Sequence, residues 1–220
     1  MAAVQQVAYG GFGTTHDITV TAVGSGNGVI VIFKMATSVS LTSVTDNQGN
    51  TYTEDLSFAA VQSNTHRVYS SWNITDGPVT ITITTGSATS VNGFVQEASG
   101  RGSAPTVDTS SVASGSGNTV TDTQTVSNAD AHACGMVQFT DAEAFTPNTG
   151  YSRLPASGSQ YELLCWDDDV GSGSQTLGGT STTNPDWSLS FVAYSVAAGG
   201  GASIIVPTIL RNYRHMGAIN

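Results

Sequence analysis

The sequence predicts an all-β fold, a jelly-roll-like antiparallel β-sandwich with an extended C-terminal arm. Short runs that alternate Val or Ile with Thr recur along the chain, and no helical period persists anywhere. Turn-forming Gly, Asn, Asp and Pro residues separate these runs at the spacing of a sandwich or jelly roll. The final segment, residues 204–220, differs in composition from everything that precedes it.

Strand character is clearest where apolar residues alternate strictly with polar ones. Val79, Ile81 and Ile83 lie on one face of such a run, whereas residues 29–33 are apolar on both faces and predict a central strand. The predicted strands are residues 3–9, 17–23, 28–37, 51–61, 67–73, 79–84, 91–98, 106–112, 119–126, 131–139, 160–167, 174–179 and 187–197.

The domain organisation follows from composition along the chain. A length of 220 residues is enough to bury a core, and neither a change in composition nor a convincing internal repeat divides the first 196 residues. We therefore expect one sandwich domain at residues 1–197, a Gly-rich hinge at 198–203 and an anchoring arm at 204–220.

Charge is distributed unevenly between the domain and the arm. Residues 1–203 contain four basic and sixteen acidic residues, a formal charge of −12, whereas the arm carries +2 from Arg211 and Arg214. A nucleic-acid partner needs a basic face, so we expect none. The N-terminal segment lacks the pattern of a secretory signal and the longest apolar run is too short to span a bilayer, so we expect no membrane partner.

Carboxylates are the first candidates for chemistry. Glu54, Glu97, Glu143 and Glu162 are of the type that a glycoside hydrolase uses in pairs. Glu97 is the most notable, because it lies in an otherwise apolar strand. We interpret it as a strand-end carboxylate bonded to backbone or to a neighbouring turn, and we expect no catalytic residues and no enzyme.

Metal sites are the second possibility, and we expect neither a metal nor another cofactor. His16, His66, His132 and His215 lack metal-ligand spacing. Residues 46–50 are interpreted as a hairpin turn rather than a calcium loop, because they lack the acidic residue that ends an EF-hand loop. Residues 167–169, three consecutive aspartates, are either a solvated loop or a cation site.

Cysteine and aromatic residues complete the candidates. Cys134 and Cys165 each lie in a strand-like run and are interpreted as buried free thiols, with a disulfide as the alternative. The aromatic residues are interpreted mainly as packing residues, whereas a glycan-binding module would need two or three of them on one exposed face. These aromatic residues are Trp72, Trp166, Trp187, Tyr52, Tyr69, Tyr151 and Tyr161.

Several local patterns together resemble a known type of β-domain. They are the strand–turn–strand at residues 43–52, the strand pair at 69–83, the strand end at 95–100 followed by Asp108, and the final strand opened by Trp187. In this order they resemble a jelly-roll unit of tailed-phage virion proteins, which also occurs in some secreted bacterial proteins. The resemblance implies a capsid decoration (cement) protein, a head fibre or a tail component, located in the virion, with homotrimers on the capsid surface.

The arm is the main candidate for partner binding. Its aliphatic residues need a surface to bury against, and Pro207 disfavours both helix and central strand. We expect the partner to be the major capsid protein or another virion protein, or a second copy of the chain. The alternatives are that these residues cover the chain's own sandwich, or that the arm is disordered or cleaved. The alternative function is a carbohydrate- or host-receptor-binding module of a fibre or secreted protein. The predicted partner-binding residues are Ile204, Ile205, Val206, Pro207, Ile209, Leu210, Arg211, Tyr213 and Arg214.

Overall fold

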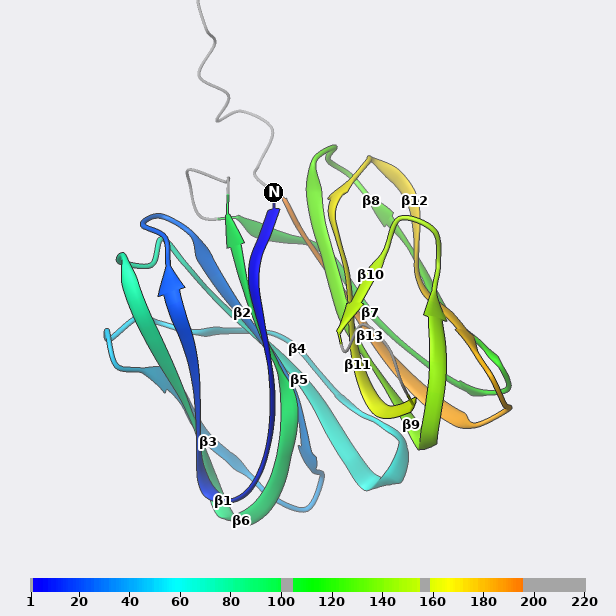
Figure 1. Ribbon diagram of the computed structural model, residues 1–220, viewed down its shortest axis with the longest axis horizontal. Helices are drawn as coiled ribbons and strands as arrows, with labels where there is room; N and C mark the ends of the chain where they lie inside the picture. The colour runs from blue at the N-terminus through cyan, green and yellow to red at the C-terminus, as the bar shows by residue number, and fades with distance from the viewer. Residues whose placement is uncertain (1, 100–104, 155–158, 196–220) are drawn as a thin grey trace, which may run out of the picture.

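The computed structural model describes residues 2–99, 105–154 and 159–195, which form two antiparallel β-sheets lying side by side (Figure 1). The prediction of an all-β antiparallel sandwich is confirmed. Apart from a 3-10 turn at Val61–Ser63, the regular elements within the described residues are all strands. The described residues include no helix with the length and apolar character that crossing a membrane requires.

The first sheet is built by the N-terminal part of the chain, residues 2–99, called the first half below. Its strands lie in the order β4-β5-β2-β6-β1, and β3 pairs with β6 as well. The strands are β1 (Ala2–Val23), β2 (Gly28–Ala36), β3 (Leu41–Asp46), β4 (Thr53–Ala59), β5 (Asn64–Trp72) and β6 (Gly77–Ser99).

The two longest strands fold this sheet into two layers. β1 pairs with β6 over almost its whole length, but the register shifts between Gly13 and Thr15. Before the shift, β1 pairs with the C-terminal part of β6, which also pairs with β2; after it, β1 pairs with the N-terminal part, which also pairs with β3. Ile18 and Ile81 in one layer share a hydrophobic cluster with Val31 in the other, so the layers enclose a core.

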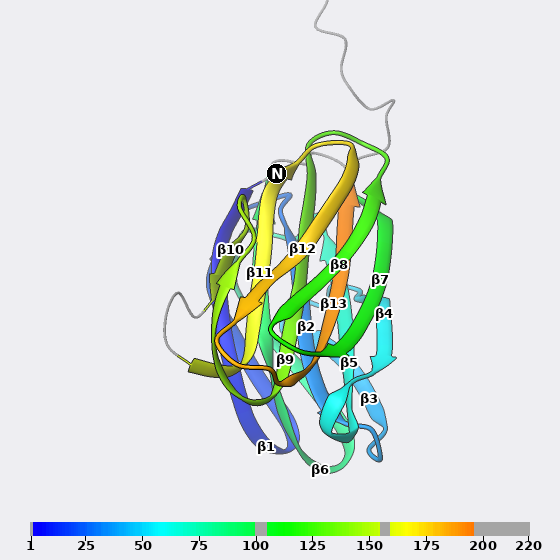
Figure 2. The same ribbon diagram turned by 90° about the vertical axis from the view of Figure 1, so that its right-hand side faces the viewer.

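The second half, residues 105–195, forms the other sheet. β9 pairs with β11 and β13 along its first part and with β12 at its end, while β7 pairs with β13 and β8 with β12. The strands are β7 (Thr106–Ser116), β8 (Thr119–Val126), β9 (Ala131–Pro147), β10 (Ser152–Leu154), β11 (Ser159–Val170), β12 (Gly173–Ser181) and β13 (Asp186–Ser195). Figure 2 views the molecule from the side of this half.

Strand pairing in the second half repeats that of the first. The single strand β9 corresponds to β2 and β3 together, and β10 and β11 correspond to β4 and β5. The long strand β1 corresponds to two strands, β7 and β8. The long strand β6 likewise corresponds to β12 and β13. We found no convincing internal repeat in the sequence, because strand pairing tolerates many side chains at equivalent positions. Trp72 near the end of β5 and Trp166 in β11 are one residue type that both halves retain.

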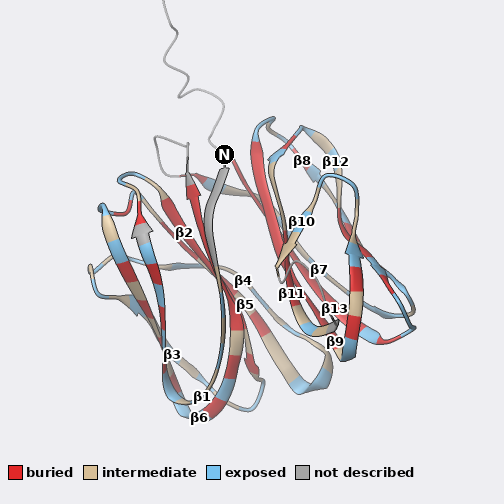
Figure 3. Ribbon diagram, in the orientation of Figure 1, coloured by how far each residue is buried: buried red, intermediate tan, exposed pale blue. Residues whose placement is uncertain are grey.

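Burial follows this division into halves. One hydrophobic cluster fills the first half, a second fills the second half, and a third joins them through the facing strands β2, β5, β6, β9, β11 and β13. Ile30, Phe94, Met136 and Val192 belong to the third cluster and are buried. Figure 3 shows buried positions along the strands that face each other across the junction.

The predicted strands differ from the observed ones mainly by merging. Residues 3–9 and 17–23 belong to the single strand β1, and residues 79–84 and 91–98 to β6. Merging occurs because each strand passes through the corner between layers without leaving its pairing partner. The separate strand β10 was not predicted, and β3 was expected only as the first strand of the strand–turn–strand at residues 43–52.

Candidate functional site

The residues predicted to bind a partner all lie outside the described residues. This holds for the hinge at 198–203 and for the arm at 204–220, which includes Ile204, Ile205, Val206, Pro207, Ile209, Leu210, Arg211, Tyr213 and Arg214. The arm therefore stays a prediction.

Glu97 is held by the neighbouring turn, as the interpretation of the sequence expected. Its carboxylate is fully buried in β6, and Oε1 accepts hydrogen bonds from the Gly24 backbone N–H at 2.8 Å and from Asn27 Nδ2 at 2.6 Å. Both donors belong to the turn between β1 and β2. Glu97 therefore fixes this turn against the sheet.

The other glutamates also have identifiable partners. Glu143 accepts hydrogen bonds from the hydroxyls of Thr182 and Thr183, and these bonds lower its pKa although burial alone would raise it. Glu54 pairs with Arg67 on the neighbouring strand. Glu162 pairs with Lys34 of the other half, which places it at the junction between the halves.

Residues 46–50 form a turn, but the prediction of a hairpin was wrong. The flanking strands β3 and β4 pair with β6 and β5 respectively, so this turn carries the chain from one layer to the other. Asp46 Oδ1 accepts hydrogen bonds from the backbone N–H groups of Gln48 and Asn50, both at 3.0 Å. Burial alone would raise the pKa of Asp46, but these bonds and those of Asn50 and Tyr52 side chains lower it.

Two buried histidines lie between the halves. His66 Nε2 lies 2.9 Å from Gln138 Oε1, and His132 Nε2 lies 2.8 Å from Gln96 Oε1. Each pair joins a strand of one half to a strand of the other. Burial lowers the pKa of His66 to about 4, and the positive charge of Lys34 acts in the same direction.

The aspartates at 167–169 do not converge on one point. Asp168 Oδ1 lies 3.2 Å from His132 Nδ1, while Asp167 Oδ1 accepts a hydrogen bond from the Asp169 backbone N–H. Within the described residues, no group of three or more His, Cys, Asp or Glu side chains is placed to hold a metal ion.

The cysteines are buried free thiols, which confirms the preferred interpretation. Cys134 belongs to the cluster between the halves and Cys165 to the core of the second half. Burial raises the pKa of both thiols, that of Cys165 to about 12.

Most predicted aromatic residues pack rather than form an exposed platform. Trp187 is buried, and Tyr52 and Tyr69 pack against the core of the first half. Among the described large hydrophobic residues, Tyr161 and Phe12 are notably exposed. Trp72 lies partly buried at the junction, with its ring 5.2 Å from that of Tyr194.

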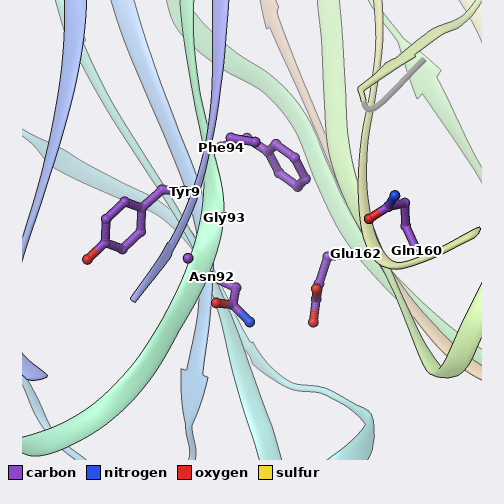
Figure 4. Close-up of a pocket in the computed structure, with 8 residues that line it drawn as sticks. Tyr9, Asn92, Gly93, Phe94, Gln160 and Glu162 are labelled. Carbon is purple, nitrogen blue, oxygen red and sulfur yellow. The ribbon is translucent and has the colours of Figure 1, made fainter. Parts of the chain in front are cut away.

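Two grooves open along the junction between the halves. The first, called the β1–β11 groove, has a volume of about 240 Å³, and its lining includes Ala8, Gly10, Asn92, Phe94, Gln160 and Glu162. Figure 4 shows Phe94 and Glu162 between the facing strands, whereas the Tyr9 ring points away from them. That orientation agrees with the 3.0 Å contact between Tyr9 Oη and His16 Nδ1.

The second groove, called the β4–β7 groove, has a volume of about 230 Å³ and is lined by Thr53, Asp55, Trp72, Thr106, Val107 and Tyr194. Tyr194 Oη donates a 2.7 Å hydrogen bond to Asp55 Oδ2, which ties the second half to the first. Burial raises the pKa of Asp55, while hydrogen bonds from Ser70 and Tyr194 oppose that shift.

Among the side chains that line these grooves, the sequence analysis singled out only Glu162 and Trp72. Asp55, Asn92 and Gln160 have no motif around them, and they become neighbours of the other half only through the packing of two sheets. Recognition of an internal repeat in the sequence would have predicted two similar halves and a junction between them.

Comparisons with known proteins identified no relative of this chain. No protein-family model matches the chain, and searches of curated proteins and of solved structures found no significant match.

Proposed function

We propose that this chain is a structural protein of a phage virion, a capsid decoration (cement) protein that is anchored by its C-terminal arm. The observation that carries the proposal is the contrast between arm and body. Five aliphatic residues and two arginines follow a Gly-rich segment at the end of a body whose formal charge is −12. Such an arm suits a protein surface that offers an apolar groove and carboxylates.

The magnitude of the available binding energy supports an anchoring role. Burying the side chains of Ile204, Ile205, Val206, Ile209 and Leu210 would contribute about 1.5–3 kcal/mol each before the entropy of ordering is subtracted. Arg211 and Arg214 would add charge-assisted hydrogen bonds to carboxylates of the partner. We propose the major capsid protein or another virion protein as this partner, at the capsid surface.

The arrangement of strands within each half is compatible with the proposed role. We propose that each half is a jelly-roll unit, because β1 and β6 each contribute a segment to both layers, and eight segments then wrap around the core. We further propose a homotrimer, since closed symmetric oligomers are the usual state of such parts. Glu97 and Glu143, the glutamates bonded to neighbouring turns, have structural roles that are consistent with a non-enzymatic protein.

The proposal is tested by removing residues 204–220 and measuring incorporation of the purified chain into virion particles. A matched variant, Arg211→Glu with Arg214→Glu, keeps the aliphatic residues and reverses the charge. We expect the truncated chain to lose incorporation and the charge-reversed chain to keep part of it. Undiminished incorporation of the truncated chain would refute the anchoring role.

A further inference from the structure

The carboxylate of Asp55 is half-buried in the β4–β7 groove, and the groups that stabilise its charge there are hydroxyls. Tyr194 Oη donates to Oδ2 at 2.7 Å, and Ser70 also donates to the carboxylate. Ser70 Oγ accepts the indole N–H of Trp72 at 3.1 Å, so its own proton is free for Asp55. These bonds orient the carboxylate, which has acceptor positions beyond two bonds.

Two glutamates of the molecule show what a carboxylate in this position lacks. Glu162 pairs with Lys34 and Glu54 pairs with Arg67, so each has a cationic partner. Burial removes hydration from a carboxylate, and a cation replaces that hydration better than hydroxyls do. Asp55 therefore favours a positively charged occupant of the groove and disfavours an anionic one.

The rest of the lining suits a long side chain that carries its charge at the end. Trp72 and Val107 are partly buried and supply apolar surface, while the exposed Thr53 and Thr106 supply hydroxyls. A guanidinium forms paired hydrogen bonds with a carboxylate and stacks on aromatic rings, and its aliphatic stem lies on apolar surface. An arginine therefore matches the groove better than a metal ion, which needs several oxygen ligands.

The strands beside the groove can also receive an extended segment. β4 and β7 lie next to each other across the junction (Figure 2). Among the described strands, β4 pairs with β5 alone and β7 with β13 alone, so each has one edge without a strand partner. Extended peptides bind such edges through main-chain hydrogen bonds. The groove thus favours an arginine that belongs to an extended peptide.

The arm of this chain has a matching sequence. Arg211 directly follows the apolar Leu210, and Pro207 disfavours helix just before them. The described chain ends at Ser195, one residue after Tyr194 of the groove, and 16 positions separate Ser195 from Arg211. An extended segment of that length spans at most about 55 Å, which is enough to reach a neighbouring molecule.

We propose that the β4–β7 groove of one copy receives Leu210 and Arg211 from the arm of a second copy, with the guanidinium on Asp55. A groove of about 230 Å³ holds few side chains, and a neighbouring copy offers the other aliphatic residues of the arm a surface for burial. Each copy carries both groove and arm, so successive contacts close into a ring such as the proposed trimer. The inference rests on the proposed function, because it takes the arm as a segment that binds a protein partner.

The test measures the mass of the purified full chain by light scattering over a range of concentrations, without virion shells. Asp55→Asn removes the charge but keeps an acceptor for Tyr194, and Arg211→Gln removes the guanidinium without touching the described fold. Asp141→Asn is the matched control, because Asp141 is an exposed aspartate on β9 that lines neither groove. Circular dichroism melts check that every variant is folded.

We expect trimers for the wild-type chain and for the control. The dissociation constant of assembly should rise roughly 10–100-fold in Asp55→Asn and in Arg211→Gln, because each loses a charge-assisted contact. A mixture of these two variants should form dimers at concentrations where each alone is monomeric, since the intact arm of one fits the intact groove of the other.

Three results would each overturn the proposal: a monomeric wild-type chain, unchanged assembly of either variant, or a mixture that stays monomeric. The last result would place the arm in the groove of its own chain. Failure of the anchoring role gives a different result, because it is measured with shells. A chain that is monomeric alone but needs its arm to bind shells would keep the anchoring role and exclude the groove. Undiminished incorporation of the truncated chain would refute anchoring even where copies assemble through the groove.

Discussion

Acid should weaken the folded state through His66, and the size of the effect follows from its environment. The ring is fully buried between the halves, and burial lowers its pKa from 6.5 to about 4. The unfolded chain therefore binds a proton at this residue below about pH 6.5, whereas the folded chain does not until about pH 4. Because the unfolded state binds more protons in this window, stability falls as the pH falls from 6.5 towards 4.

The expected loss is about 3 kcal/mol between pH 7 and pH 4, since each pKa unit corresponds to about 1.4 kcal/mol. The assay is urea unfolding at several pH values for the wild-type chain and for His66→Gln. The glutamine keeps a donor that can reach Gln138, which normally lies 2.9 Å from His66 Nε2, but it does not titrate.

Each chain gives a curve of unfolding free energy against pH. The difference between the two curves is the contribution of His66, because the carboxylates that also titrate in this range are the same in both chains. We expect the stability of His66→Gln to fall less on acidification, by about 3 kcal/mol over the whole window. Identical pH dependence of the two chains would refute the reasoning, because it would mean that the histidine is charged or solvated in the folded state.

Two further predictions concern the close packing of β9 and the state of the thiols. Gly135→Ala should destabilise the fold by about 2 kcal/mol or more, because its Cβ would lie 1.8 Å from the carbonyl oxygen of Ser190. Gly171→Ala, where nothing lies within 4 Å of the added Cβ, should change stability by less than about 0.5 kcal/mol, and equal urea midpoints for the two variants would contradict the packing. Cys134 and Cys165 should resist iodoacetamide in the folded chain and both react after unfolding, as measured by mass spectrometry; rapid labelling of the folded chain would contradict their burial.

Local chemistry made much of the fold predictable. Alternation at Val79, Ile81 and Ile83 predicted a strand with one buried face, and all three side chains are buried. Residues 29–33, apolar on both faces, form part of a central strand whose two faces meet different clusters. These predictions held because strand periodicity depends only on neighbouring residues.

The parts that could not be predicted depend on contacts between distant segments. The turn at residues 46–50 has the composition of a hairpin, but β3 and β4 pair with different strands. Asp55 and Tyr194 meet across the junction although 139 positions separate them in the chain. Neither the repeated strand pairing nor the two grooves leave a local pattern, because they arise only when the two halves pack together.

The proposed role of the arm is to join this chain to a protein partner. The most direct measurement is the mass of the full chain and of a chain ending at residue 203, each determined by light scattering at the same concentration and again with virion shells present. We expect the full chain to be a trimer that binds shells, and the shortened chain to lose shell binding. Equal masses and equal shell binding for both chains would contradict it.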